Sequence, residues 1–416
     1  SHAEARFQLL ETIRIYARER LLDSGEAEPV HGRHRDWYLA LAEEAKPDFF
    51  SGPAPAAWIE VFDREHDNLR AALEWSLAEA GGAAAGLSLA AAMWRYWEIR
   101  GYFVEGRRWL ERTLGATDGE VSTLRANALT GAGILAHIQG DFPAALAAHE
   151  QSLAQHRQLG NPHSIGFALH NLANVAAEHG ELARARELYE ESNELARASG
   201  DRRAPAIGLI SLADVVSRQG DTAAADAIFE QSVEALAELG DQWGMAFALD
   251  SFGLAAARAG EISKARSRHE ESLAISRRLG DERGVARTLM HLADLALGEG
   301  DTDRAGALQR ECLRIRHALR DMPGVATAME RLVWVTMADA GEDAARLLGA
   351  AEALREAIHA PVPSAARGEY ERSVRMLAAR LGQELFEAAR LKGRAMGPDV
   401  AVAAILADVK PLPEPA

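Results

Sequence analysis

Glycine recurs every forty residues through the middle of this chain. One series consists of Gly140, Gly180, Gly220, Gly260 and Gly300, and a second series halfway between its members consists of Gly160, Gly200, Gly240 and Gly280. An acidic residue follows most of these glycines. Self-similarity at a period of about 20–50 residues is typical of stacked repeat proteins. The sequence therefore predicts five clear units over residues 122–321, and a sixth, less regular unit over residues 322–360.

Each unit contains two segments that are long enough to be helices. In the unit over residues 162–201, apolar or small residues lie on one helical face before Gly180 and again after it. These positions are Leu169, Leu172, Ala173 and Ala176, followed by Leu182, Ala185, Leu188, Tyr189 and Leu195. Glycine suits the left-handed residue that ends a helix, and the acidic residue behind it can cap the next helix or offset its dipole. Two antiparallel helices per unit are therefore expected. Because neither buries its apolar face alone, neighbouring units must stack.

These residues resemble the tetratricopeptide repeat (TPR). The match rests on Leu172, Ala173, Gly180, Ala185 and Tyr189. Their counterparts in the following units are Leu212, Ala213, Gly220, Ala225 and Phe229, then Phe252, Gly253, Gly260, Ala265 and His269, then Leu292, Ala293, Gly300, Ala305 and Gln309. The resemblance implies an all-α fold, a TPR-like α–α superhelix of right-handed sense. The 40-residue period exceeds the usual period of about 34 residues, which suggests longer helices of the kind seen in the repeats of bacterial regulators.

Both ends of the chain resemble bacterial STAND-type regulators, which are multidomain ATPases with NB-ARC modules and include LuxR- and SARP-like transcriptional regulators. Residues 6–22, 31–45 and 65–75 resemble segments that precede the repeats in such proteins, and the C-terminal block resembles their closing segment. Taken alone, Leu69, Leu73 and Leu77 are better explained as a core stripe. The expected division is a winged-helix-like end over 1–30, a helical connector with a degenerate repeat over 31–120, the repeat array over 121–345, capping helices over 346–410 and a disordered tail over 411–416.

The composition excludes several classes of function. A net charge of −16 argues against a direct nucleic-acid interface, which needs a basic face. The sequence contains no P-loop, no HExxH motif and no GxSxG motif, so we expect no enzyme activity and no cofactor. It also lacks a signal peptide and any apolar run of about 18 residues, so we expect no membrane partner and a cytoplasmic location.

The residues that could bind a metal ion are few. The single cysteine, Cys312, occupies the repeat column of Ser152, Ser192, Ser232 and Ser272, and we interpret it as a small packing residue. His31 and His34 could form a metal pair, but no further ligands are evident nearby, so a solvated helix end explains them better. The repeat pattern places almost every other His, Asp and Glu on an exposed helix position. We therefore predict no metal site.

Aromatic residues are concentrated before the clear repeats. Trp37, Trp58, Trp75, Trp94, Trp97 and Trp109 all lie within residues 31–120. We expect them to join the array to a preceding domain, and the alternative is an aromatic cage for a ligand. Trp334, in the sixth unit, could close the groove of the array as an aromatic wall or belong to the core.

In a TPR array the first helix of each unit lines the concave groove. Counting from Leu172 and Ala173, the predicted ligand-binding residues are His170, Asn171, Asn174, Asp214, Arg218, Asp250, Arg258 and Asp294. An asparagine side chain can pair with both the donor and the acceptor of a peptide backbone. Arg218 and Arg258 lie one unit apart and could hold a carboxylate or a phosphate. The alternative is a solvated concave face without a dedicated ligand.

These observations favour a non-catalytic binding module. By the resemblance, the chain is the TPR sensor of a bacterial signalling ATPase or transcriptional regulator. It would bind a peptide, protein or small effector in its groove and contact an upstream nucleotide-binding domain that is absent from this chain. The alternative is a free-standing TPR adaptor that assembles protein complexes. The first residues are Ser-His without Met, which is expected of a fragment and favours the regulator.

Overall fold

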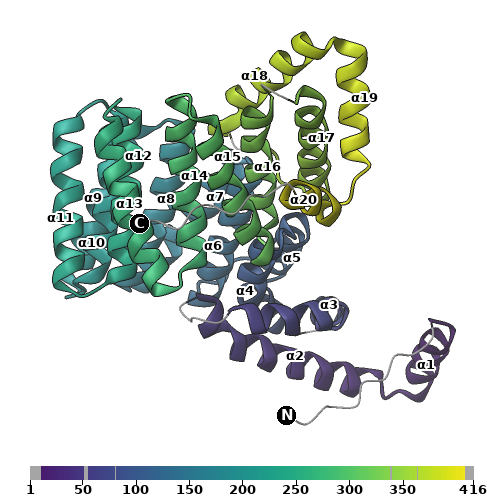
Figure 1. The fold of residues 1–416 in the computed structure, drawn as a ribbon. Coiled ribbons are helices and arrows are strands. Elements are labelled where there is room, and N and C mark those ends of the chain that lie inside the picture. Colours follow the sequence, from purple (N-terminus) through teal and green to yellow (C-terminus); the bar gives the residue numbers. More distant parts are fainter. Residues whose placement is uncertain (1–10, 51–54, 80, 338–339, 363, 408–416) are drawn as a thin grey trace. The chain divides into compact units, whose positions relative to one another are not determined.

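The computed structural model describes residues 11–50, 55–79, 81–337, 340–362 and 364–407. Within these ranges the secondary structure consists of twenty helices, without strands (Figure 1). The all-α prediction is therefore confirmed. The chain divides into two compact units: residues 1–96 with 108–120, and residues 97–107 with 121–416. The predicted tail over 411–416 and the first residues of the winged-helix-like segment lie outside the described ranges.

The first unit is built on long N-terminal helices. They are α1 (Glu11–Ser24), α2 (Ala27–Phe50) and α3 (Pro55–Ala78), together with parts of α4 (Ala83–Arg100) and α5 (Phe103–Ala116). The Phe62 ring centroid lies 5.3 Å from that of Phe49 and 5.2 Å from that of Tyr96, which makes an aromatic core. Leu69 and Leu73 are fully buried on α3 and form the expected stripe.

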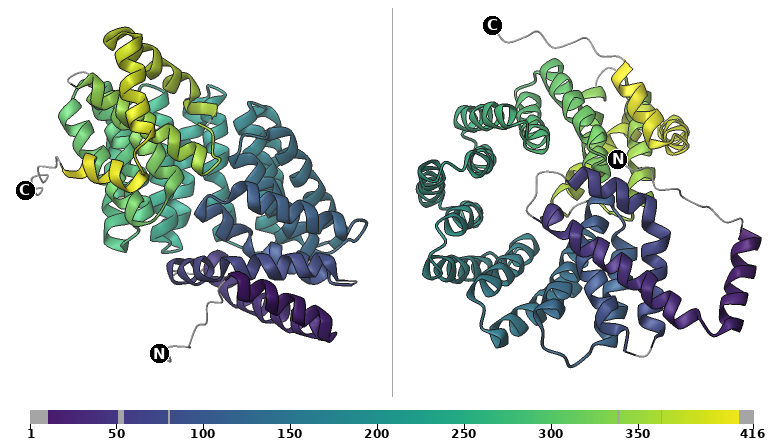
Figure 2. Two further views of the ribbon diagram at one scale, coloured as in Figure 1. Left: turned by 90° about the vertical axis from the view of Figure 1, so that its right-hand side faces the viewer. Right: turned by 90° about the horizontal axis from the view of Figure 1, so that it is seen from below.

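The second unit contains the repeat array, in which helices alternate between first and second members of a hairpin. The first members are α6 (Thr123–Ile138), α8 (Pro162–His179), α10 (Arg203–Arg218), α12 (Gln242–Arg258), α14 (Glu282–Gly298) and α16 (Met322–Thr336). The second members are α7 (Phe142–Leu159), α9 (Leu182–Ala198), α11 (Thr222–Glu238), α13 (Ile262–Leu279), α15 (Thr302–Ala318) and α17 (Gly341–Ala357). Within this unit, the successive hairpins from α8 to α15 follow a curve (Figure 2).

The glycines and acidic residues end and begin these helices as the sequence indicates. Gly180 adopts φ of 92°, in the left-handed region, and its amide donates to the carbonyl oxygen of Ala177. The side chain of Asp221 accepts a hydrogen bond from the backbone N–H of Ala224 and thereby caps α11. Within the described residues, Glu181 and Glu261 make no such bond, so at those two positions any stabilisation comes from charge near the helix dipole alone.

A repeated side-chain hydrogen bond joins the two helices of each hairpin. A small residue on the second helix donates to a backbone carbonyl oxygen 26 positions earlier, on the first helix. The pairs are Ser152 with Ala126, Ser192 with Gly166, Ser232 with Ala206, Ser272 with Ala246 and Cys312 with Ala286. Burial raises the pKa of the Cys312 thiol, which keeps it protonated and able to donate. The residues of this column therefore pack between the two helices and also hold them together through a hydrogen bond.

The C-terminal block closes the array with α18 (Ser364–Leu381), α19 (Gln383–Arg394) and α20 (Pro398–Ala407). Two glycines let α17 and α19 approach closely. A Cβ atom at Gly349 would lie 2.0 Å from the carbonyl oxygen of Arg390, and one at Gly393 would lie 1.9 Å from that of Arg346. Phe386, Ala389, Ala401 and Val402 are buried in one core cluster with residues of α15, α16 and α17. This block covers the apolar end that a stacked array must protect.

Candidate functional site

A groove with a volume of about 490 Å³ lies on the second unit. The first helices of four successive hairpins line most of it. The lining residues are Ile134, His137 and Ile138 on α6; Asn171, Asn174, Ala177 and Glu178 on α8; Ile210, Ser211, Asp214 and Arg218 on α10; Phe247, Ser251 and Leu254 on α12; and Glu98, His149 and Tyr189. Residues three and four apart share one helix face, so repetition of the unit turns that face into a continuous wall.

Four of the predicted binding residues line this groove: Asn171, Asn174, Asp214 and Arg218. The Tyr189 hydroxyl donates a hydrogen bond to Oδ1 of Asn174 over 2.5 Å, which orients the amide. Burial raises the pKa of that hydroxyl, so it remains a donor. The structure thus gathers these four residues on one surface, and their contact with a ligand stays a prediction.

The other four predicted residues have partners within the protein. The His170 ring packs beside the Tyr189 ring with centroids 5.2 Å apart, and burial lowers its pKa to about 4. Asp294 lies 3.3 Å from Arg331, and its burial raises the pKa of the carboxyl. Arg258 hydrogen-bonds to Asp214. Asp250 is 1% exposed, so it is a buried residue rather than the groove-facing one that the column pattern indicates.

Charges along the groove are already matched. Asp214 bonds to Arg258 and lies 3.8 Å from Arg218, whose second nitrogen donates to the carbonyl oxygen of Ala177 over 2.6 Å. His137 lies 2.9 Å from Glu178, and its hydrogen bond lowers the pKa of that carboxyl. A ligand carboxylate or phosphate would therefore have to displace Asp214 from these arginines.

Two polar groups of the lining have unused hydrogen-bonding capacity. The amide nitrogen of Asn171 and Nδ1 of His149 are buried and lack hydrogen-bond partners among the described residues. Burial also lowers the pKa of His149 to about 4, so the ring is neutral at pH 7. A buried amide without a partner carries a free-energy cost that a ligand carbonyl can remove.

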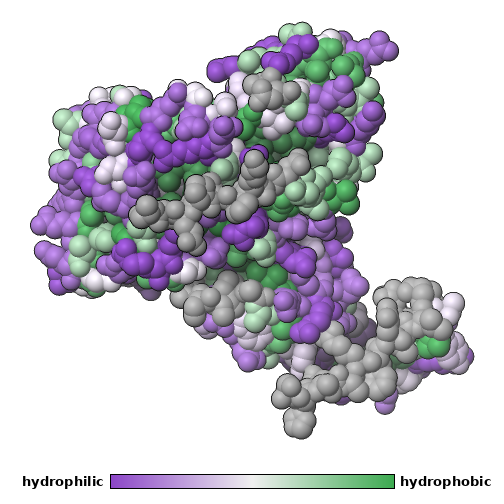
Figure 3. Space-filling view, in the orientation of Figure 1, coloured by the Kyte–Doolittle hydropathy of each residue, from purple (hydrophilic) through white to green (hydrophobic). Residues whose placement is uncertain are grey.

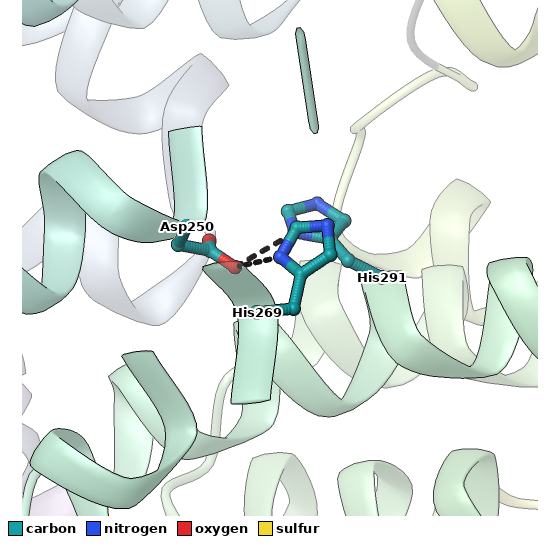
Figure 4. A group of neighbouring side chains, drawn as sticks. All are labelled: Asp250, His269 and His291. Carbon is teal, nitrogen blue, oxygen red and sulfur yellow. Dashed lines mark hydrogen bonds and ion pairs between the residues drawn. The ribbon is translucent and has the colours of Figure 1, made fainter. Parts of the chain in front are cut away.

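A second polar cluster lies beyond the groove and was missed by the sequence reasoning. Asp250 Oδ1 lies 2.9 Å from Nδ1 of His269 and 3.1 Å from Nδ1 of His291 (Figure 4). Nε of Arg287 donates to Oδ2 of Asp250 over 2.7 Å. Burial alone would raise the pKa of Asp250, but His291, His269 and Arg287 together hold it well below its usual range.

The expectation that almost every histidine and acid of the repeats is exposed is therefore wrong at this cluster, because His269 and Asp250 are buried. A signal was present in the sequence. One unit earlier, the positions of Asp250, His269, Arg287 and His291 are held by Ile210, Phe229, Phe247 and Ser251. Asp250, His269 and Arg287 thus lie where the preceding positions of the repeat hold apolar residues, and all three belong to one pair of neighbouring units.

The aromatic residues singled out in the sequence are mostly packing residues. Trp94, Trp97 and Trp109 are at most 5% exposed, which leaves no open face for an aromatic cage at those positions. His31 and His34 pack against the Trp75 ring with centroid distances of 4.1 and 4.5 Å. Trp334 packs against the C-terminal core and lines a small cavity of about 40 Å³ with Glu330, Arg355 and Tyr370, away from the groove lining.

Across the helices that the structure describes, none is both long and apolar enough to cross a bilayer. Hydrophilic side chains cover most of the face of the repeat helices in Figure 3, with apolar ones scattered between them.

Known proteins share both the repeats and the fold. Residues 124–198, 164–238 and 204–278 match the profile of the tetratricopeptide repeat family. Over 202 residues the chain is 36% identical to candidate HTH-type transcriptional regulators of Mycobacterium bovis and Mycobacterium tuberculosis. The match covers 43% of this chain and 22% of each relative, so the chain spans less than a quarter of their length.

Two crystal structures resemble most of the chain. A Rap protein complexed with Competence and Sporulation Factor has a TM-score of 0.54 and 13% identity, with 89% of this chain and 99% of that chain covered. NprR in complex with its cognate peptide NprX has a TM-score of 0.51 and 13% identity, with 85% and 98% covered. At such low identity the likeness concerns the fold alone. The chain therefore contains a region of tetratricopeptide repeats, arranged as a TPR-like α–α superhelix.

Proposed function

We propose that the groove binds a linear peptide, or an extended segment of a partner protein, as the sensor module of a bacterial signalling ATPase or transcriptional regulator. The observation that carries this proposal is the buried amide nitrogen of Asn171, which lines the groove without a hydrogen-bond partner among the described residues. A peptide carbonyl oxygen supplies the acceptor that this donor lacks.

The remaining lining suits the same class of ligand. Ile134, Ile138, Ile210, Phe247 and Leu254 offer apolar contacts for side chains. The charged residues already pair with one another, so recognition relies on backbone hydrogen bonds and apolar contacts rather than on a ligand carboxylate. Apolar walls with a few placed polar groups are typical of ligand sites.

The regulatory context is supported by the relatives. The chain matches part of candidate HTH-type transcriptional regulators, and the solved structures of similar fold include NprR with its cognate peptide. In this proposal, ligand binding changes a contact between the repeats and an upstream nucleotide-binding domain, and the protein acts in the cytoplasm without direct nucleic-acid contact by this region.

A peptide library tests the proposal. A ligand that binds only the native state raises the melting temperature, so hits from a thermal-shift screen of synthetic peptides are followed by calorimetric titration. Replacing Asn171→Leu should weaken a hit roughly three- to tenfold, the loss expected for one hydrogen bond. The control is Glu230→Gln, an exposed position on α11 outside the groove lining. Equal affinity for wild type and Asn171→Leu contradicts the groove assignment, and a screen in which folded proteins bind but peptides do not favours an adaptor.

A further inference from the structure

We propose that Asp250, His269 and His291 form a binding site for a divalent first-row transition-metal ion, with Zn²⁺ as the best match. The three side chains come from α12, α13 and α14 and converge on one point (Figure 4). Each offers one ligand atom, and these atoms all lie within 4.8 Å of one another.

The separations fit a metal ion. With metal–ligand bonds of about 2.0–2.2 Å, neighbouring ligand atoms lie about 2.9 Å apart in octahedral and about 3.4 Å apart in tetrahedral geometry. Oδ1 of Asp250 lies 2.9 Å and 3.1 Å from the two imidazole nitrogens. The third separation, between the two imidazole nitrogens, is at most 4.8 Å. Rotation of His291 would shorten it, because this side chain is 12% exposed and less confined than the other two.

The donor set also fits this class of ion. Imidazole nitrogens suit zinc, copper, iron and nickel, and two histidines with one carboxylate leave a coordination position for water. Arg287 bonds to the other carboxylate oxygen, Oδ2, and so holds Oδ1 toward the histidines, as outer partners of metal ligands commonly do.

Packing alone does not explain the cluster. At the positions equivalent to Asp250 and His269, the preceding unit has Ile210 and Phe229, which are buried in an apolar core. The His269 ring lies against Gly253, where a Cβ atom would come within 2.7 Å of the ring. Its Nε2 is buried and lacks a hydrogen-bond partner among the described residues. A histidine here therefore costs polar burial that phenylalanine avoids. A metal–Nδ1 bond would offset that cost, while Nε2 would keep the ring proton.

A bound ion would join two successive repeat units. Asp250 and His269 belong to one hairpin, whereas His291 belongs to the next. Because α12 also carries the groove residues Phe247, Ser251 and Leu254, the ion would fix one wall of the groove against the following unit. Binding to the native state alone would raise the melting temperature with ion concentration.

His149 provides a matched control for the variants that remove a proposed metal ligand. His149 occupies the column of His269 in an earlier unit and likewise lies against a glycine, Gly133. The positions of Asp250 and His291 are there held by Thr130 and Asn171, so this histidine lacks the other two ligands. His149→Phe therefore removes a buried histidine of the same kind without touching the proposed site.

The experiment titrates the chelator-treated full chain with Co²⁺, followed by its visible absorption, and with Zn²⁺ by calorimetry. We expect one ion per chain, Co²⁺ bands that Zn²⁺ abolishes, and unchanged binding in His149→Phe. Loss of an outer partner costs about ten- to a hundredfold in metal affinity, so loss of a ligand in His269→Phe or His291→Ser should cost at least about a hundredfold. Circular dichroism of the metal-free variants checks that they are folded. The residues introduced, Phe and Ser, are those at the equivalent positions of the preceding unit.

The proposal fails if both variants bind as tightly as wild type, or if His149→Phe abolishes binding. It also fails if wild-type protein binds neither ion at millimolar concentration, in which case the three residues form an ion-pair network only.

Discussion

The Ser232 hydroxyl donates a hydrogen bond to the carbonyl oxygen of Ala206 over 2.7 Å, and this bond joins α11 to α10. Ser232 is fully buried, and equivalent bonds recur in the neighbouring hairpins with the same spacing of 26 residues. The repeated bond couples the two helices of a hairpin at a point where their backbones lie close together. It is therefore a recurring feature of the array rather than an isolated contact.

Replacing Ser232→Ala should lower the free energy of unfolding by about 1 kcal/mol, because a buried hydrogen bond is lost while the side-chain volume barely changes. Urea denaturation measures the change. Ser267→Ala, which removes a contact with Glu271 on the surface of α13, should change stability by less than about 0.5 kcal/mol. Cys312→Ser should be neutral or stabilising, since a hydroxyl is the stronger donor. Equal effects of Ser232→Ala and Ser267→Ala would argue against this role for the bond.

Arg320 occupies the next position in the second glycine series, forty residues after Gly280, and adopts φ of 53°. Its amide donates to the carbonyl oxygen of His317, as the amide of Gly280 does to that of Arg277. A residue with a Cβ atom is strained by roughly 1–2 kcal/mol in the left-handed region. Glycine avoids this strain, but part of the gain is lost because glycine has more conformational freedom in the unfolded chain.

Arg320→Gly should therefore raise the free energy of unfolding by about 0.5–1 kcal/mol. Arg314→Gly provides the contrast, because Arg314 is an exposed residue inside α15, where glycine should cost about 1 kcal/mol. Thermal and urea unfolding of the two variants should shift in opposite directions. Destabilisation by both would show that the backbone at Arg320 is not strained.

The buried His149 should make the protein sensitive to acid. Its folded pKa of about 4 lies below the ordinary value of 6.5 because of burial, with a smaller contribution from nearby His137. The unfolded chain therefore binds the proton at higher pH. Stability from this group is complete above pH 6.5 and is lost as the pH falls toward 4. The shift corresponds to about 3 kcal/mol.

Comparing wild type with His149→Phe tests this sign. The equivalent residue two units later is Phe229, so the ring has a precedent in this column. The variant should lose less stability than wild type between pH 6.5 and 4, and the two should have parallel pH profiles above that window. Profiles that are parallel throughout would mean that the imidazole does not titrate in this range.

The sequence predicted the parts of this structure that depend on a single helix or on repetition. The spacing of Gly180 and its equivalents located the helix ends, and the three- and four-residue spacing of Asn171, Asn174, Asp214 and Arg218 located four residues of the groove lining. These features follow from helix periodicity, which is visible in one chain.

The contacts between units were not predictable in the same way. Asp250 shares a repeat column with His170, but it is buried against His269, Arg287 and His291, and two of these partners, His269 and Arg287, lie where phenylalanines lie one unit earlier. Which partner a charged side chain meets depends on the angle between successive hairpins and on its rotamer. The column pattern contains neither. It suggested that Arg218 and Arg258 could hold a ligand carboxylate or phosphate, whereas they pair with Asp214.

The last prediction concerns the ion pair between Glu330 on α16 and Arg355 on α17. Two hydrogen bonds of 2.5 and 2.8 Å join the side chains, which are 12% and 7% exposed. Removing one partner leaves the other charge buried, so Glu330→Gln should lower the free energy of unfolding by about 3–5 kcal/mol. The exposed pair of Arg157 and Glu191 is the control, and Glu191→Gln should cost less than about 1 kcal/mol.

The double variant Glu330→Leu with Arg355→Met should recover most of the loss, because an apolar pair leaves no buried charge. If the double variant is as unstable as Glu330→Gln in urea denaturation, the cost comes from packing rather than from an uncompensated guanidinium.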